Sequence, residues 1–403
     1  MAALAPRSIV PRVAFGFNSS VSTPVVALEQ ESLTYITFTG SRAAFVSAEE
    51  IGGENLAEGS SKPMHFFPAI RVRGTPARVV TAVAFHKRRK LLGLCVSQLP
   101  RAAPPAVVVY SLAQCGGAWV PTVVGTHTWD EAPGGATFGA ADFNADASLV
   151  VCASKAEGRE RPSVAVGFDW AKPPEEGLAF CSPLEAACAH VCCHPRDPLE
   201  LSTSGPQHVQ LWRLLRSELK PRAAASHLPP GGGGKAEYTI HLWLESEMLV
   251  AGTSGGDVAI VQENEQTQRF EGVHLSSVRG VVPLEHGFAT CCSSCGVCVF
   301  RRDDDPRQRK RGKVGVKLMR RLALDGARNV VACSSFPPAN ANSAAATLLV
   351  CRHAVALLDL PQLLLTTDPK AKRLPAKRLG APHHEGDVMA LSAGLSKPLL
   401  ASC

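Results

Sequence analysis

The chain has 403 residues, of which 45% are hydrophobic and 19% are charged, and its formal net charge is +7. This composition supplies enough apolar surface for a large core and excludes a chain that is disordered throughout. The charge is too small for this length to indicate a nucleic-acid binder by itself, and no apolar run approaches the roughly 20 residues that span a bilayer. The 14 cysteines lie mostly in apolar runs, so we expect reduced thiols in a reducing compartment.

One pattern recurs along the chain: an apolar run, a polar turn, and a second apolar run that ends on small residues. Its copies begin at Thr81, Phe138, Ala187, Tyr238, Val278 and Val388. Each copy predicts two strands joined by a tight turn, and the spacing of about 40 to 60 residues is near the period of a four-stranded propeller blade. We therefore predict an all-β fold, a seven-bladed WD40-like β-propeller over residues 24–380.

The predicted blades follow one another from the N-terminal side. They cover residues 24–68, 78–125, 136–183, 186–222, a compact fifth blade that ends with DVAIVQE at 257–263, then 278–324 and 327–379. Trp212 lies in the third strand of the fourth blade, where a WD repeat usually places its tryptophan. The Pro- and Gly-rich stretch 228–235 predicts a flexible connection into the fifth blade.

Apolar strand residues should be buried between the blades, and the residues of the central channel should be mostly small or apolar and hold no ligand. The residues expected to be buried are Val83, Phe85, Leu92, Leu94, Val150, Leu211, Trp243 and Val250.

Both ends of the chain lie outside the seven predicted blades. Residues 381–403 predict the first half of a further WD repeat, with two strands and the Lys397-Pro398 turn. A half-blade leaves backbone edges unpaired, so we favour a chain that is a fragment of a longer protein. The alternative is that the strand-like run RVAFGF at 12–17, within an N-terminal segment 1–23, closes the ring by pairing with this half-blade.

Several clusters of reactive side chains have both a functional and a structural interpretation. Cys292, Cys295 and Cys298 have a spacing that zinc or an iron–sulfur cluster could use, but neighbouring strand residues point to opposite faces, so packing is the preferred interpretation. The same holds for the cysteines and histidines at 188–194. The GGGGK run at 231–235 lacks the Ser or Thr of a phosphate-binding loop, and a histidine ahead of an inner strand, such as His384, is ordinary in propellers. We expect no catalytic, cofactor-binding or metal-binding residue, and no enzyme.

The most polar insertion is the basic tract 301–321. Its candidate contacts with an acidic partner are Arg307, Arg309, Lys310, Arg311 and Lys313. The alternatives are a solvated loop between two strands of the sixth blade, an acidic protein, and a nucleic-acid backbone. The neighbouring aspartates weaken the local field and no aromatic residues interleave for base stacking, so nucleic acid is the least favoured partner. A second basic tract at 370–378 is interpreted in the same way.

The fourth and fifth blades resemble a narrower family. The segments CCHPRDPLELSTSGPQHVQLWRL and EYTIHLWLESEMLVAGTSGGDVAIVQENEQ are similar to the N-terminal propeller of the WD-repeat cilia- and flagella-associated proteins. PRVAFGFNSSV and HEGDVMALSAGLSKPLLASC occupy the corresponding ends. The resemblance covers most of the chain. It implies tandem propellers followed by coiled coil on the ciliary axoneme, where such proteins support the assembly or regulation of inner-arm dynein.

The sequence thus predicts a non-enzymatic WD-repeat scaffold of the ciliary or flagellar axoneme, without cofactors. Expected partners are axonemal or dynein-associated proteins, including acidic tubulin tails, with no membrane contact. The rival hypothesis is a cytosolic or nuclear WD-repeat scaffold in RNA or ribosome assembly, which the basic tracts would suit. A hydrolase of the propeller type ranks third, and histidines with perturbed pKa values in the channel would favour it.

Overall fold

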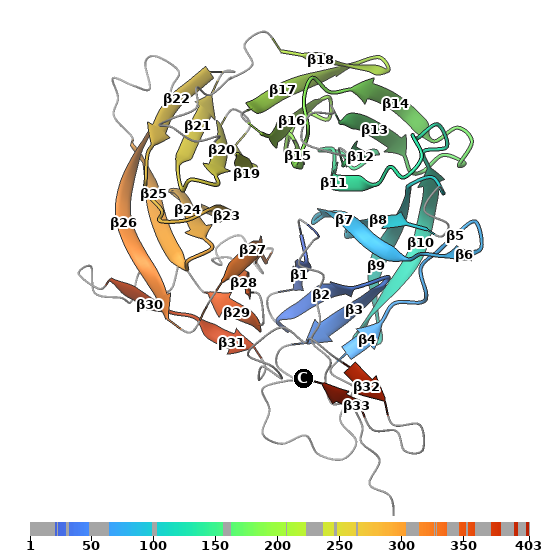
Figure 1. The fold of residues 1–403 in the computed structure, drawn as a ribbon, viewed down its shortest axis with the longest axis horizontal. Helices are drawn as coiled ribbons and strands as arrows, with labels where there is room; N and C mark the ends of the chain where they lie inside the picture. Colours follow the sequence, from blue (N-terminus) through green and yellow to red (C-terminus); the bar gives the residue numbers. More distant parts are fainter. Residues whose placement is uncertain are drawn as a thin grey trace, which may run out of the picture.

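The computed structural model is a closed ring of seven β-sheets (Figure 1). It describes residues 21, 23–29, 32–47, 64–98, 103–155, 163–206, 208–222, 237–245, 248–262, 265–303, 314–325, 327, 329–336, 346–351, 354–358, 372–379, 391–393 and 400–402. In this part of the chain all regular structure is β, and no helix is present that could cross a membrane. The predicted all-β, seven-bladed propeller is confirmed.

The first three blades are four-stranded antiparallel meanders. Blade one contains β1 (Val25–Glu29), β2 (Thr34–Thr39), β3 (Arg42–Ser47) and β4 (Met64–Phe66). The short hairpin of β5 (Arg71–Val72) and β6 (Thr75–Pro76) leads to blade two, which contains β7 (Val79–His86), β8 (Leu91–Ser97), β9 (Ala106–Cys115) and β10 (Ala118–Thr128). Blade three contains β11 (Phe138–Phe143), β12 (Leu149–Ser154), β13 (Val164–Asp169) and β14 (Leu178–Pro183).

The next three blades repeat this order. Blade four contains β15 (His190–Cys193), β16 (Glu200–Gly205), β17 (His208–Leu215) and β18 (Glu218–Pro221). Blade five contains β19 (Tyr238–Glu245), β20 (Met248–Thr253), β21 (Val258–Gln262) and β22 (Glu265–Phe270). Blade six contains β23 (Val278–Leu284), β24 (Gly287–Cys292), β25 (Gly296–Asp303) and β26 (Gly315–Asp325).

Blade seven is connected in a way that the repeat pattern does not predict. Its strands are β27 (Val330–Ser335), β28 (Thr347–Cys351), β29 (Ala354–Leu358) and β31 (Lys377–Leu379). Between β29 and β31 the chain first forms β30 (Arg373–Pro375), which pairs in parallel with β26 and gives blade six a fifth strand. Blades six and seven are therefore linked by backbone hydrogen bonds at their outer edge.

The core is divided into seven apolar clusters, one for each contact between neighbouring blades. One cluster lies between blades one and seven, and there the Ala27 amide also donates to Ser334 Oγ at 3.0 Å. Because each sheet is covered on both faces, its inner strands contain runs of buried apolar residues, as in β8 (Leu91–Ser97) and β20 (Met248–Thr253). Six of the residues expected to be buried are buried, whereas Phe85 and Trp243 are partly exposed.

The predicted half-repeat after the seventh blade contains two strands. β32 (Leu391–Ala393) and β33 (Leu400–Ser402) pair antiparallel with each other and form a separate two-stranded sheet. The run RVAFGF at 12–17 lies outside the described residues, so its role in ring closure stays a prediction. The described strands of blades one and seven already meet (Figure 1).

Candidate functional site

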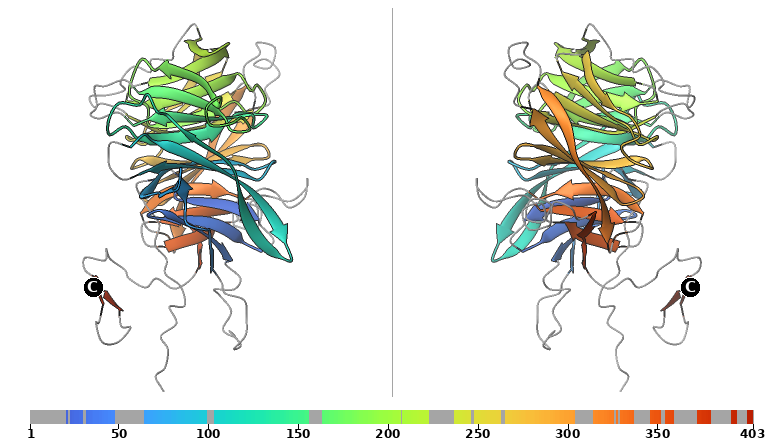
Figure 2. Two further views of the ribbon diagram at one scale, coloured as in Figure 1. Left: turned by 90° about the vertical axis from the view of Figure 1, so that its right-hand side faces the viewer. Right: turned by 90° about the vertical axis from the view of Figure 1, so that its left-hand side faces the viewer.

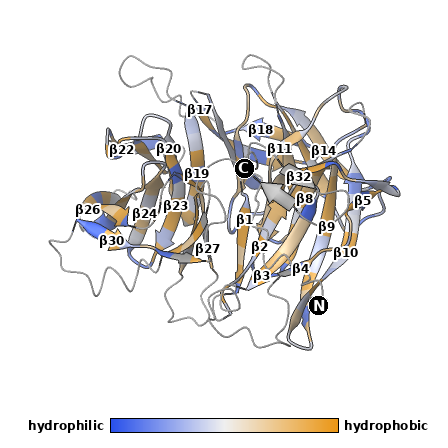
Figure 3. Cartoon of the chain, turned by 60° about the horizontal axis from the view of Figure 1, so that its bottom comes forward, coloured by the Kyte–Doolittle hydropathy of each residue, from blue (hydrophilic) through white to orange (hydrophobic). Residues whose placement is uncertain are grey.

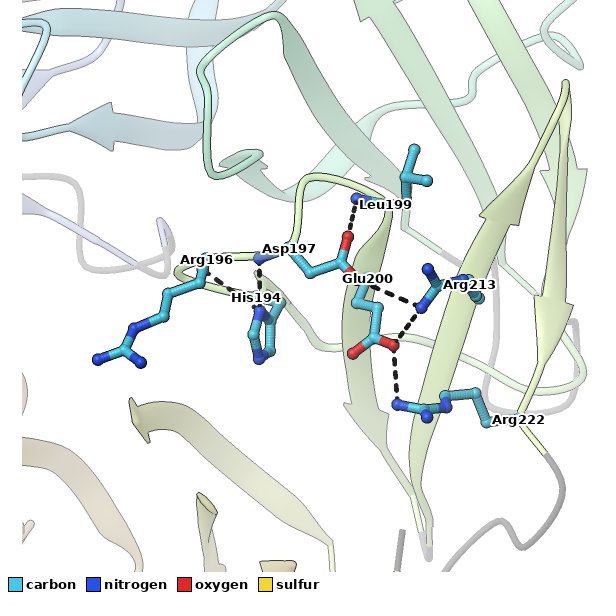
Figure 4. A network of polar contacts seen from close by, with 7 residues as sticks. All are labelled: His194, Arg196, Asp197, Leu199, Glu200, Arg213 and Arg222. Carbon is cyan, nitrogen blue, oxygen red and sulfur yellow. Dashed lines mark hydrogen bonds and ion pairs between the residues drawn. The ribbon is translucent and has the colours of Figure 1, made fainter. Parts of the chain in front are cut away.

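Tight polar networks hold the turns of the blades, and blade four gives the clearest example (Figure 4). Glu200 accepts hydrogen bonds from Arg213 at 2.6 Å and Arg222 at 2.8 Å, and Asp197 lies 3.2 Å from Arg213. In the same blade the Trp212 indole donates to Thr203 Oγ1 at 2.8 Å, deep in the sheet. The carboxylates neutralise both arginines, so we assign this network to structure and not to partner binding.

The basic edge of the ring is where the two predicted basic tracts meet. Pairing of β26 with β30 sets Ala323 opposite Arg373, although the two residues are far apart in the sequence. Exposed cations therefore follow β25, β26, β30 and β31 over one outer edge, and Figure 3 shows hydrophilic residues on β26 and β30. The exposed residues of this basic edge are Arg301, Lys317, Arg321, Lys372, Arg373 and Lys377.

Two of these cations are compensated by nearby carboxylates. Lys317 Nζ lies 2.7 Å from Asp303, and Arg373 lies 3.2 Å from Asp325. The other four have no carboxylate within ion-pair distance among the described residues. These four cations give the edge a positive field that would attract an acidic partner.

The five residues proposed as acidic-partner contacts, Arg307, Arg309, Lys310, Arg311 and Lys313, lie outside the described residues. In the sequence they fall between β25 and β26, and the two ends of the tract 301–321 that the structure describes belong to these strands. Their role stays a prediction.

The central channel encloses about 860 Å³ and is lined by the first strands of the blades. Small and apolar residues make up much of the lining, as expected. Side chains of Lys, Arg, Glu and His also line it, namely Lys155, His190, Glu237, His241 and Arg279. The expectation of a small, apolar channel is therefore only partly correct, because strands that are apolar on average can still turn single polar residues toward the lumen.

A pair of histidines joins blades four and five inside this channel. His190 Nδ1 and His241 Nδ1 are 3.3 Å apart. His241 also contacts Ser204 Oγ at 2.7 Å and Ser202 Oγ at 2.9 Å. Because the Ser202 hydroxyl donates to the Cys192 carbonyl, we assign the proton of His241 to Nε2, which leaves Nδ1 to accept.

Both histidines are neutral in this arrangement. Burial lowers the pKa of His190 to about 4, and burial together with the neighbouring His190 lowers the pKa of His241 well below its usual value. Histidines with perturbed pKa values in the channel are the feature that would favour a hydrolase. Ser202 and Ser204, however, are fully buried, so neither hydroxyl can reach a substrate. The network is suited to holding two blades together.

The cysteine cluster of blade six is divided between two blade interfaces. Cys291 packs in the cluster shared with blade seven, and Cys298 packs in the cluster shared with blade five. His274 contacts Thr290 Oγ1 at 2.7 Å and lies 3.8 Å from Cys298 Sγ. No group of three or more metal-ligating side chains converges in the described part of the chain.

One thiol of this cluster has an unusual environment. Burial opposes ionisation of Cys292, but hydrogen bonds from His274, Ser276 and Ser294 lower its pKa to about 6. Cys292 Sγ also accepts a hydrogen bond from the Gly296 amide at 3.2 Å. These contacts tie the loop that precedes β23 to the turn between β24 and β25.

The turn between β7 and β8 is a charged feature that the sequence analysis missed. Lys87, Arg88, Arg89 and Lys90 are consecutive, and Lys87 Nζ reaches the Ser335 carbonyl of blade seven at 2.9 Å. The run of four cations in one tight turn could have been identified from the sequence as a charged site. In the repeat pattern these four residues form only the polar turn of a copy.

Comparisons with known proteins give limited similarity. No family model matches the chain. Echinoderm microtubule-associated protein-like 2 of Homo sapiens is 30% identical over 123 residues, which are 30% of this chain and 18% of that protein. The Mus musculus protein is 29% identical over the same length. The match therefore spans less than a fifth of these curated relatives.

Two solved structures are similar at low sequence identity. The β-propeller domain of Myceliophteria thermophila Cps50 (Swd1) has a TM-score of 0.47 and 12% identity, over 69% of this chain and 82% of that one. The WD40 propeller domain of Doa1 has a TM-score of 0.49 and 10% identity, over 81% and 87%. The assignment of the fold rests on the seven sheets of this chain itself.

Proposed function

We propose that this propeller is a non-catalytic scaffold that binds protein partners on the ciliary or flagellar axoneme and supports the assembly or regulation of inner-arm dynein. The fold offers several exposed faces made of turns and outer strands, and propellers of the WD40 type generally mediate protein–protein contacts. The buried serines beside the channel histidines give no support to hydrolysis.

The basic edge is the observation that carries the proposal. Two tracts from different parts of the sequence lie side by side through the parallel pairing of β26 and β30, and four exposed cations there have no described carboxylate partner. A field of this sign attracts flexible acidic segments. The acidic tails of tubulin are partners of this chemistry, and they coat the surface on which an axonemal scaffold has to sit.

Two similarities support a microtubule setting. The sequence resembles the WD-repeat cilia- and flagella-associated proteins in its fourth and fifth blades, and the curated relative that it matches over 123 residues is named as microtubule-associated. Nucleic acid remains the rival partner of the same edge. The described cations alternate there with aliphatic residues, and no aromatic residue lies on β26, β30 or β31 for bases to stack on.

Sedimentation with microtubules tests this proposal. The wild-type chain should co-sediment with intact microtubules, and binding should fall after proteolytic removal of the tubulin tails or in higher salt. Charge reversal at Arg301→Glu with Arg321→Glu should weaken binding by about tenfold. The matched control Arg196→Glu with Arg216→Glu carries the same change of charge at exposed positions of blade four, outside both proposed binding surfaces, and should bind normally.

Two results would contradict the proposal. One is binding that is insensitive to tail removal and to the reversal on the basic edge. The other is a stronger interaction of the same edge with ribosomal RNA than with microtubules, at equal salt, which would support the rival scaffold in RNA or ribosome assembly.

A further inference from the structure

We propose that blade two has a second docking surface, made of β10 and the turn Lys87–Lys90, that takes an extended protein segment with acidic residues followed by β-branched residues. We call this the blade-two surface. It lies on a different blade from the basic edge and does not depend on the microtubule proposal.

No strand among the described residues covers the outer edge of β10. In the described part of the chain β10 pairs only with β9, whereas the other strand of eleven residues, β26, is covered at its edge by β30. The long hairpin of β9 and β10 extends beyond the other strands of its blade (Figure 2). An uncovered edge presents backbone donors and acceptors to any strand that can reach it.

The side chains of β10 do little to protect this edge. The strand contains no Asp, Glu, Lys or Arg, although charges are the usual protection of exposed edges. Val120, Val123 and Val124 are 41%, 54% and 39% exposed. β26, in contrast, carries three cations and one aspartate over the same length. An uncharged edge with exposed valines is suited to a partner strand with its own β-branched side chains.

The turn Lys87–Lys90 gives this surface its charge. The Leu112 amide of β9 donates to the Lys90 carbonyl at 2.9 Å, and Leu112 lies opposite Pro121, so this turn is level with the middle of β10, with β9 between them. Lys90 joins the two parts directly, because its Nζ lies 5.8 Å from the centre of the Trp119 ring on β10. Arg88 and Arg89 are exposed and have no ion-pair partner among the described carboxylates. The charge complement of this turn is an acidic segment.

Two features of β10 explain why binding needs both the strand edge and the cations of the turn. Pro121 lacks a backbone N–H, and the register between β10 and β9 shifts between Val123 and Gly125. Proline and bulges shorten the ladder that an added strand can form. An apolar strand alone would therefore gain few hydrogen bonds, and the cations have to contribute to its affinity. This arrangement favours a partner with acidic residues over nonspecific strand addition.

Fluorescence polarisation with a labelled peptide tests the proposal on the full chain. The probe is a run of glutamates followed by alternating valine and threonine, and the control peptides replace either the glutamates with glutamine or the valines with glycine. The wild-type chain should bind the probe, and each control peptide should bind about tenfold more weakly or worse.

Variants of the chain locate the site. Arg88→Glu with Arg89→Glu, and separately Val123→Asn with Val124→Asn, should each weaken binding by about tenfold. The control Arg196→Glu with Arg216→Glu, at exposed positions of blade four, should bind normally. All of these positions are exposed, and unchanged thermal unfolding checks that each variant is folded. Binding that survives either blade-two change would overturn the proposal. So would a dimer of the wild-type chain that Val123→Asn with Val124→Asn abolishes, because the occupant would then be a second copy.

Discussion

The histidine pair between blades four and five makes the stability of the ring depend on pH. The pKa of His190 is lowered from 6.5 to about 4 by burial, so below pH 6.5 the unfolded chain binds a proton that the folded chain does not. Stability then falls as the pH falls from 6.5 to 4 and is fully present above this window. The lowered pKa of His241 acts in the same direction.

We predict that the free energy of unfolding in urea falls between pH 7 and pH 5, with His190 contributing about 2 kcal/mol of the loss. His190→Asn should remove its share of this pH dependence. His286→Asn is the control, because the His286 side chain is 74% exposed in a turn of blade six. If His190→Asn and wild type lose equal stability over this range, the described network does not hold a neutral imidazole.

At the scale of elements, the short strand β30 holds the two basic tracts together. Leu374, its central residue, is fully buried in the cluster between blades six and seven and lies opposite Leu324. Its neighbours Arg373 and Pro375 are exposed. Three residues form too few hydrogen bonds to fix a strand by themselves, so we attribute the placement of β30 mainly to this leucine.

Leu374→Ala should therefore destabilise the chain by about 2–4 kcal/mol and also weaken microtubule binding, because the cations around β30 would lose their fixed position. Arg373→Ala, at the neighbouring exposed position, should cost less than about 1 kcal/mol. Chemical denaturation with both variants measures the difference. Equal small effects would show that β30 does not dock on blade six.

The elements that the sequence predicts best are the hairpins with a strong pattern. Copies such as the one that begins at Phe138 have a long apolar run on each side of a polar turn, and both strands form as expected. The sequence pattern does not predict β30. This three-residue strand lies in a basic tract, and its position depends on a tertiary contact and not on a local pattern. The contact between His190 and His241 in the channel could not be predicted either, because the pattern does not show which face of an inner strand lines the channel.

At the scale of the whole molecule, seven blades close a ring in which each blade supplies half of two apolar clusters. The repeat spacing predicts this number of blades because each unit has to bury both faces of its sheet against neighbours. The features that distinguish this ring from its repeat pattern are the basic edge, the histidine pair and the uncharged edge of β10. These depend on single residues and on pairings between segments distant in sequence.

The most direct test of the account is the fate of the chain in fractionated cilia. A tagged chain expressed in ciliated cells should be recovered with detergent-extracted axonemes, and the variant Arg301→Glu with Arg321→Glu should be depleted from that fraction. Recovery of the wild-type chain with ribosomal precursors, or equal recovery of wild type and variant in the axoneme, would contradict a scaffold that holds microtubules through its basic edge.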